Sequence, residues 1–277
     1  MIAARSHRRP DFNAAFGGTV VAMLLFAALF GPGLVHYDPL ALDLMARLQG
    51  PSATHLLGAD EFGRDLLSRV VHGARVSVTI SVLTVCLAMA IGIVLGTVAG
   101  YAGGWIDRLA MLLNDSLLAF PGLLLALGIM AVFGASVGAI IIALGLAYVP
   151  AVVRVMRASV MSLREREFVE ASRVIGNREI TTMLRHVLPN CIAPLTVLAT
   201  TMFGWVILSE TALSFLGLGV PPPAPSWGNM LAAARPHIVQ APYLIIVPGL
   251  CVSLTLLGIN MLGDALRDWL DPKMQAS

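Results

Sequence analysis

Residues 77–101 read SVTISVLTVCLAMAIGIVLGTVAGY, a run without a single Asp, Glu, Lys or Arg. A helix of about 20 apolar residues is long enough to cross the hydrocarbon core of a bilayer. Within the run, Gly92, Gly96 and Gly100 recur every four residues, so one face of the helix carries no side chains. Such a face lets another helix approach closely. The run therefore predicts a membrane-spanning helix with a tightly packed neighbour.

The rest of the chain has the same apolar character. Of its 277 residues, 57% are hydrophobic and 12% are charged, and the mean hydropathy is +0.84. Soluble domains contain about 45–50% apolar and about 25% charged residues, so this composition is typical of a polytopic membrane protein. The predicted fold class is all-α, with six transmembrane helices. Their expected ranges are 13–35, 77–101, 109–133, 137–157, 191–213 and 243–263.

The distribution of basic residues predicts how these helices are oriented. Loops on the cytoplasmic side of a membrane carry an excess of Lys and Arg. With six spans, 13 of the 18 basic residues fall on the side of both termini and loop 158–190, and five fall on the other side. We therefore expect both termini to be cytoplasmic, with 36–76 and 214–242 facing outward. The first span lacks a clear cleavage site and is interpreted as uncleaved.

The residue types present exclude two classes of enzyme. Lys273 is the only lysine and is followed by Met274, so the chain lacks the Lys-Ser or Lys-Thr pair of a phosphate-binding loop. The chain is therefore not expected to hydrolyse ATP itself. An intramembrane serine protease needs a histidine at the depth of its serine, and no histidine lies in a predicted span.

Neither the cysteines nor the histidines have the spacing of a metal site. The three cysteines lie in apolar segments or at their edges and are interpreted as packing residues; they are Cys86, Cys191 and Cys251. Four histidines fall on the predicted outer side without a pair at i, i+4; they are His36, His55, His72 and His237. We expect them to be surface residues, and no metal site is predicted.

One long polar segment interrupts the apolar chain, and residues 166–190 of it read REFVEASRVIGNREITTMLRHVLPN. Two sets of residues have helical spacing: Phe168, Ala171, Ser172 and Ile175, then Ile180, Met183, Leu184 and Val187. Gly176 and Asn177 lie between the sets and favour a helix end. The pattern predicts two short amphipathic helices joined at Gly176 and ending at Leu188-Pro189. From the pattern alone, docking to a partner protein and lying on lipid headgroups both remain open.

Five blocks of this sequence resemble one family of transport proteins. Glu170-Ala171-Ser172, Gly176 and Val187-Leu188-Pro189 resemble the EAA loop of ABC importer permeases, with Ser172 and His186 departing from the usual Ala and Ile. The other four blocks look like the dipeptide/oligopeptide/nickel permease family, in particular its second, C-type subunit. They are LGADEFGRDLLSRVVHGARVSV (57–78), DSLLAFPGLLLAL (115–127), SETALSFLGLGVPPPAPSWGNML (209–231) and GDALRDWLDPK (263–273).

The resemblance implies a fold, partners and a mode of action. It implies the type I ABC importer permease fold, and a transport subunit of a bacterial inner membrane rather than an enzyme. The implied partners are a homologous second permease subunit, two ATPase subunits, an extracytoplasmic solute-binding protein and the lipid bilayer, with no nucleic acid. ATP and Mg would be bound by the ATPase subunits, so no cofactor is expected in this chain. Di- or oligopeptides are the expected substrates, and nickel chelates or glutathione are the alternative.

The resemblance also assigns roles to individual residues of the polar segment. Glu170 would offer its charge to the ATPase, Ala171 and Ser172 would allow close approach, and Gly176 would form the bend. Leu188 and Pro189 complete the motif. A passive channel is disfavoured, because such a loop has no role in an unpowered pore.

Four residues are candidates for the pathway or its gating, namely Asp115, Glu210, Pro121 and Pro150. Charges in the hydrocarbon region are costly and mark functional positions, but near a membrane boundary each carboxylate can equally form a structural pair. The two prolines bend helices, either as hinges or as fixed kinks.

The predicted outer side holds four candidate contacts for the binding protein, namely Arg64, Asp65, Arg69 and Trp227. The first three lie in an expected short interfacial helix that leads into the second span. Trp227 lies in the proline-rich run PPPAPSWG at 221–228, which cannot form a regular helix.

These features divide the chain into three parts. Residues 1–76 would hold the first span and the outer interfacial segment. Residues 77–264 would form a five-helix core that contains the coupling loop 158–190. Residues 265–277 would form a cytoplasmic tail.

Overall fold

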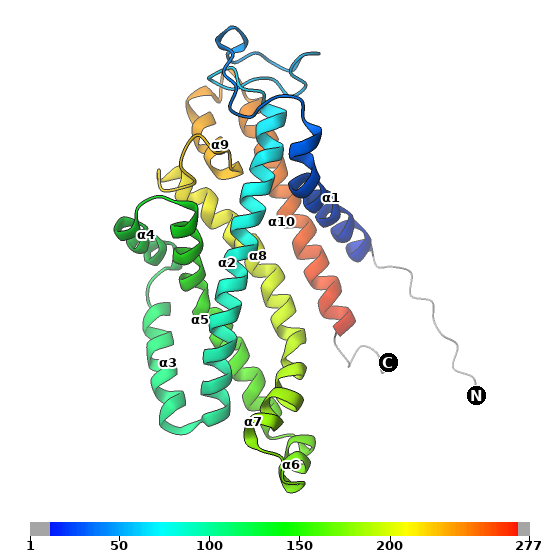
Figure 1. The fold of residues 1–277 in the computed structure, drawn as a ribbon, viewed down its shortest axis with the longest axis vertical. Helices are drawn as coiled ribbons and strands as arrows, with labels where there is room; N and C mark the ends of the chain where they lie inside the picture. The colour runs from blue at the N-terminus through cyan, green and yellow to red at the C-terminus, as the bar shows by residue number, and fades with distance from the viewer. Residues whose placement is uncertain (1–11, 271–277) are drawn as a thin grey trace, which may run out of the picture.

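The computed structural model describes residues 12–270, and Figure 1 shows a bundle of helices that is elongated along one axis. Its α-helices are α1 (Phe12–Leu34), α2 (Leu66–Ala102), α3 (Gly104–Leu118), α4 (Gly122–Phe133), α5 (Val137–Arg164), α6 (Glu167–Val174), α7 (Glu179–Thr182), α8 (Ile192–Phe215), α9 (Trp227–Ala234) and α10 (Tyr243–Leu270). Short helical turns lie at Leu44–Ala46, Met183–Val187, Leu188–Cys191 and Arg235–His237. Across the described range there is no named strand, and Ala59 and Asp65 form an isolated bridge. The predicted all-α class is confirmed.

The described residues contain five helical segments that are long and apolar enough to cross a membrane. They are α1, α2, α5, the segment from α7 through α8, and α10. The predicted span 109–133 is not one straight helix, because α3 and α4 are bent by 85° at the break between them. Pro121 lies at this break as the N-cap of α4, where its missing N–H cannot continue α3. Counting the bent pair as one span gives the predicted six.

The glycine face of α2 packs against α5, as its spacing predicts. A Cβ atom on Gly92 would lie 2.5 Å from Cβ of Val152, and one on Gly96 would lie 2.7 Å from Cβ of Met156. Carbon atoms do not approach so closely, so the two helices can lie this near only because no side chain intervenes. This contact holds α2 and α5 together.

The short interfacial helix expected to lead into the second span is the first part of one long helix. Helix α2 begins at Leu66 and continues without interruption to Ala102. Asp65 caps it, with its carboxylate accepting a hydrogen bond from the backbone N–H of Ser68 at 2.8 Å. The domain boundary expected between residues 76 and 77 therefore falls inside a helix. Of the tail expected at 265–277, residues 271–277 lie outside the described range.

The two ends of the bundle differ in structure (Figure 1). At one end α6 and α7 extend beyond the long helices; we call this the α6 end, residues 165–191. At the other end the loop of residues 35–65 and helix α9 cover the bundle; we call this the α9 end. Helix α1 packs along α10, and α8 lies between α2 and α10.

Candidate functional site

The α6 end is built from two short helices joined at a glycine, as the sequence predicts. Gly176 has φ +90°, a left-handed conformation that side chains disfavour. The N–H of Gly176 donates to the carbonyl of Arg173 at 2.9 Å, and the N–H of Asn177 donates to that of Ser172 at 3.2 Å. This pair of bonds is a Schellman motif, which satisfies the last carbonyls of α6. The backbone is therefore fixed where the chain reverses.

The predicted helix end at Leu188-Pro189 is wrong. Helix α7 continues through a π-helical turn at Met183–Val187 and a 3-10 turn at Leu188–Cys191 directly into α8. Pro189 sits in the first turn of that 3-10 segment, where its missing N–H needs no partner. The α6 end is thus joined to α8 without a flexible linker.

Ser172 lies inside the α6 end rather than on its surface. Its side chain is buried, and its hydroxyl lies 3.0 Å from Oγ1 of Thr182, which is also buried. The side-chain amide of Asn177 donates to the same hydroxyl at 3.0 Å. Ser172 therefore holds α6 against α7, and it has no exposed face for the close approach that the resemblance implied. Glu170 and Ala171 are exposed.

Large apolar side chains are exposed on the outside of this end. We call them the α6–α7 patch: Phe168, Val174, Ile175, Ile180 and Leu184. Val174 and Ile175 are among the most exposed side chains of the chain. Helical spacing groups apolar residues on one face, but here the buried face of α6 is formed by Val169 and Ser172. An exposed apolar surface of this kind marks a contact site for a protein or a membrane.

A polar cluster connects the α6 end to α2. Tyr101, at the end of α2, donates a short hydrogen bond to the carboxylate of Glu179. Arg173 forms an ion pair with Glu179 at 3.2 Å, and its guanidinium lies 5.9 Å from the ring centre of Tyr101. The sequence alone does not predict this cluster, because Tyr101 is 78 positions from Glu179 and no spacing rule joins them.

Charged pairs lie on the face that α3 shares with α5. Arg154 donates to Asp115 at 2.8 Å, and their side chains are 59% and 57% exposed. Closer to the α6 end, Arg157 donates to Asp107 at 2.6 Å. Ionised groups at these depths are costly against lipid. This face is therefore suited to water or to another protein. Of the two interpretations left open for Asp115, the structure shows a pair, and the pair is exposed.

Glu210 is buried where α8 meets the start of α9. Its Oε1 accepts hydrogen bonds from the hydroxyls of Ser214 at 3.0 Å and Ser226 at 2.8 Å. Its Oε2 has no partner among the described residues. Ser226 is the N-cap of α9, and a carboxylate at a helix N-terminus is favoured by the helix dipole. The geometry of Glu210 is that of a structural contact. Pro150 is also buried, within the continuous helix α5.

The candidate contacts at the α9 end are largely internal. Asp65 caps α2 and accepts a hydrogen bond from His55, and Arg69 pairs with Asp60 at 3.2 Å. All four residues are buried. Trp227 is buried, and its indole N–H donates to the carbonyl of Val70 at 3.0 Å. Arg64 pairs with Asp60 at 2.6 Å, and its side chain is 12% exposed. A partner at this end must therefore contact the exposed neighbours of these residues.

The expectation that the outer histidines are surface residues is wrong for His55. Its side chain is 7% exposed, and its Nδ1 lies 2.9 Å from Oδ1 of Asp65. Within residues 12–270, no group of three or more His, Cys, Asp and Glu side chains is arranged to hold a metal ion. The three cysteines are free thiols.

Comparison with known proteins identifies the family. The model of the binding-protein-dependent transport system inner membrane component matches residues 92–276. The chain belongs to this family. It is therefore a permease subunit of an ABC importer, a multi-pass inner-membrane protein that is not itself an enzyme.

Named relatives of the permease match it over nearly its full length. A putative peptide transport system permease of Brucella suis is 42% identical over 99% of this chain and 92% of the relative. A di/tripeptide transport system permease of Pseudomonas aeruginosa is 46% identical over 95% of this chain and 89% of the relative. A glutathione transport system permease of Escherichia coli is 43% identical over 96% of this chain and 88% of the relative.

A solved structure confirms the predicted type I fold of the permease. The inward-facing MetNI methionine ABC transporter matches with a TM-score of 0.58 and 16% identity, over 73% of this chain and 96% of the solved one. At this identity the likeness concerns the fold alone.

Proposed function

We propose that this permease forms half of a heterodimeric pathway for di- or oligopeptides and receives mechanical work from ATPase subunits through its α6 end. The observation that carries the coupling role is the α6–α7 patch, because it exposes large apolar side chains beyond the spans on a rigid support. A subunit without a phosphate-binding loop needs such a contact with its ATPase. The exposed carboxylate of Glu170 adds a charge beside the patch.

The internal contacts of the α6 end make it suitable for transmitting motion. Its base joins α8 directly, and Tyr101 ties it to α2 through Glu179. Val169 is fully buried in a cluster with Met156 and Val160 of α5. A displacement of the patch is therefore passed to three long helices at once. Leu188 and Pro189 lie in the turn that makes the connection to α8.

The translocation pathway in this proposal runs along the face that carries Asp115 and Arg154. Exposed charges on membrane-spanning helices disfavour contact with lipid tails. The second permease subunit would cover the same face and enclose the water between the two subunits. Pro121, at the bend between α3 and α4, lies close in sequence to Asp115 and is the favoured hinge; Pro150 is buried within α5.

The excess of basic residues supports a cytoplasmic position for the α6 end and both termini in this proposal. The ATPase subunits, which bind ATP and Mg, would then contact the α6 end on the cytoplasmic side. The soluble binding protein would dock on the α9 end. Arg5, Arg8, Arg9 and Lys273 contribute to this orientation and lie outside the described residues.

The named relatives support the proposed substrate class. Peptide transport permeases are 42% and 46% identical to this chain, which favours peptides. Glutathione is the second candidate, because a permease named for it is 43% identical. Nickel chelates rest on the sequence resemblance alone.

Substitution at Gly176 tests the coupling role. Gly176→Pro removes the N–H that donates to Arg173 and forces a negative φ, so uptake should be lost while the protein still inserts and assembles. Gly176→Asn is the matched control, because Asn accepts the left-handed conformation and should retain uptake. Normal uptake by the Pro variant would rule out coupling through this bend.

Uptake by cells that lack this chain tests the substrate. Labelled dipeptide, labelled glutathione and radioactive nickel are compared in parallel, with the chain restored as control. Selective loss of dipeptide uptake supports the peptide assignment. Selective loss of glutathione or nickel uptake replaces it.

A further inference from the structure

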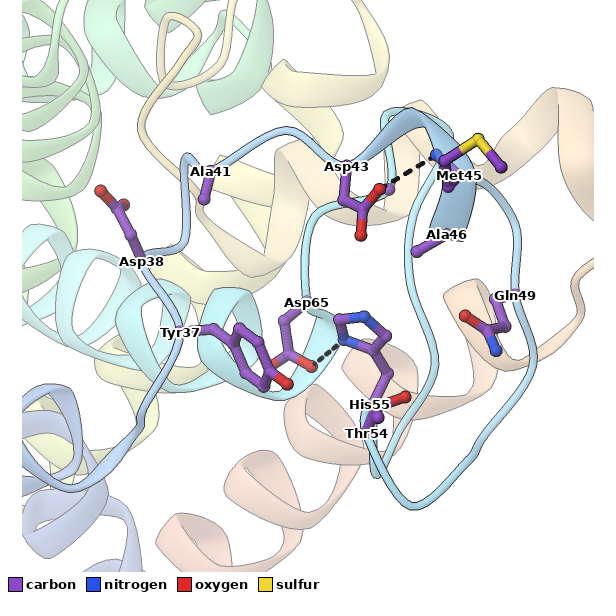
Figure 2. Close-up of a pocket in the computed structure, with 11 residues that line it drawn as sticks. Tyr37, Asp38, Ala41, Asp43, Met45, Ala46, Gln49, Thr54, His55 and Asp65 are labelled. Carbon is purple, nitrogen blue, oxygen red and sulfur yellow. Dashed lines mark hydrogen bonds and ion pairs between the residues drawn. The ribbon is translucent and has the colours of Figure 1, made fainter.

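The loop at the α9 end forms an open cavity of about 330 Å³ (Figure 2). Its lining includes Tyr37, Asp38, Asp43, Met45 and His55. This volume is within the range of specific binding sites. Among the described residues that line it, three are Asp and none is Lys or Arg. The cavity therefore favours a positively charged group.

The wall of the cavity is held rigidly. Gly63 has φ +74°, and a Cβ atom there would lie 1.6 Å from the carbonyl oxygen of Asp43. The hydroxyl of Tyr243 donates to the carbonyls of Gln49 at 2.9 Å and Ala59 at 3.1 Å, which ties the loop to α10. The site is preformed, so little ordering is needed when it binds.

A buried histidine presents one ring nitrogen to this cavity. His55 is 7% exposed, and its Nδ1 is engaged by Asp65. Its Nε2 has no hydrogen-bond partner among residues 12–270 and faces away from Asp65, toward the space below Asp43 (Figure 2). When the Nδ1–H of the neutral ring donates a hydrogen bond to Asp65, Nε2 is left as an acceptor. The ring of Tyr37 lies 5.1 Å from that of His55, and it supplies an aromatic surface for a cation.

Exposed apolar side chains lie in and next to the segment that lines the cavity. Met45, which lines the cavity, is 96% exposed, and Leu42 and Leu44 beside it are also exposed. Apolar surface around a charged recess is typical of a protein contact, in which a rim excludes water from a central polar pair. A small free amine in the cavity would not contact these apolar side chains, whereas a protein partner would.

We propose that the cavity binds a lysine or arginine side chain of the soluble binding protein, with Met45, Leu42 and Leu44 packing around it. The inference rests on the proposed function, in which the α9 end faces outward. Asp43 would pair with the cation, the Nε2 of His55 would accept a hydrogen bond from it, and Asp38 would add charge at the edge. The cavity is thus an acidic socket for docking.

The test measures binding of the purified binding protein of this system to the assembled transporter in lipid nanodiscs. The variant is Asp38→Asn with Asp43→Asn, which removes both charges. Asn keeps an acceptor for the backbone bonds from Leu40 and Met45 that the aspartates now accept. The dissociation constant should rise about tenfold or more, with a weaker dependence on salt. Asp268→Asn, which removes an exposed charge at the end of α10, is the control and should bind normally.

A photo-crosslinking residue at Met45 gives a second measurement that does not depend on the aspartates. It should crosslink to a segment of the binding protein that contains a Lys or Arg. Unchanged affinity of the double Asn variant, or no crosslink, would overturn the socket. Binding of radiolabelled lysinamide that the double variant loses would assign the cavity to a free cation instead. Loss of uptake in Gly176→Pro is measured alongside, so failure of the socket can be told apart from failure of the coupling role.

Discussion

The hydroxyl of Ser172 is the contact that fixes how α6 lies on α7, so the shape of the α6–α7 patch depends on one buried atom. Thr182 and Asn177 both meet this hydroxyl. A buried hydroxyl that loses its partner costs about 1–3 kcal/mol, whereas removing both partners together can be nearly neutral. This asymmetry makes the role of Ser172 measurable.

Ser172→Ala should loosen the α6 end without unfolding the bundle. A loss of about 1–2 kcal/mol corresponds to a factor of roughly 5–30 in a local opening equilibrium. Amide hydrogen exchange within 167–187 should therefore become faster by that factor, while α2 and α5 stay protected. Ser172→Ala with Thr182→Val should recover part of the loss. Equal exchange in the single and double variants would show that the two hydroxyls are not coupled.

Replacing Glu210 should destabilise the contact between α8 and the start of α9. Glu210→Ala leaves the hydroxyls of Ser214 and Ser226 without their acceptor and opens a void at the start of α9, at a cost of about 2–4 kcal/mol. The midpoint of thermal unfolding should fall by several degrees. Glu210→Gln keeps an acceptor oxygen and should cost less. If the Ala variant unfolds normally yet fails to transport, Glu210 belongs to the pathway instead.

Local chemistry predicted some of these residues and not others. The role of Gly176 could be predicted from sequence, because a glycine between two amphipathic sets commonly ends the first helix. The burial of Ser172 could not, because it depends on which side of α6 faces Thr182. Likewise, Asp65 and Arg69 look like surface charges in sequence, and only folding of the loop brings them to His55 and Asp60.

At the scale of helices, the close packing of α2 on a neighbouring helix could be predicted from sequence, because its glycines recur every four residues and share one helix face. Helix ends were less predictable. Hydropathy detects only the apolar part of a helix, so it placed the start of the second span at 77, although capping by Asp65 starts α2 at Leu66. It also could not show that Pro121 turns the third span through 85°.

Gly96→Ala tests the close packing of α2 on α5. The added methyl would lie 2.7 Å from both Cβ of Met156 and the carbonyl oxygen of Val153, so the helices must separate. Overpacking of this kind costs about 1–3 kcal/mol. Gly128→Ala in α4 is the matched control, because a Cβ atom there has no atom within 4 Å. Thermal unfolding of the purified protein should show a lower midpoint for the first variant and not for the second.

For the whole molecule, the decisive property is that its two ends present different surfaces. The α6 end exposes an apolar patch on a short rigid helix pair, and the α9 end holds an open cavity whose lining includes three Asp residues. One end suits an ATPase and the other suits a soluble docking protein only if they face opposite compartments. The orientation is therefore the premise on which coupling and docking both depend.

Single cysteines at the two ends test that premise. In a variant with Cys86, Cys191 and Cys251 replaced by Ala, cysteine is introduced at Met45 or at Val174, which are 96% and 82% exposed. A maleimide that cannot cross membranes should label Met45→Cys in intact spheroplasts and Val174→Cys only after permeabilisation, because the excess of Arg predicts a cytoplasmic α6 end. The opposite pattern would place the α6–α7 patch outside, away from ATP, and no coupling role for Gly176 could then stand. Labelling of both sites only after permeabilisation would keep the coupling role and remove the socket at Asp43 from the reach of any outer protein.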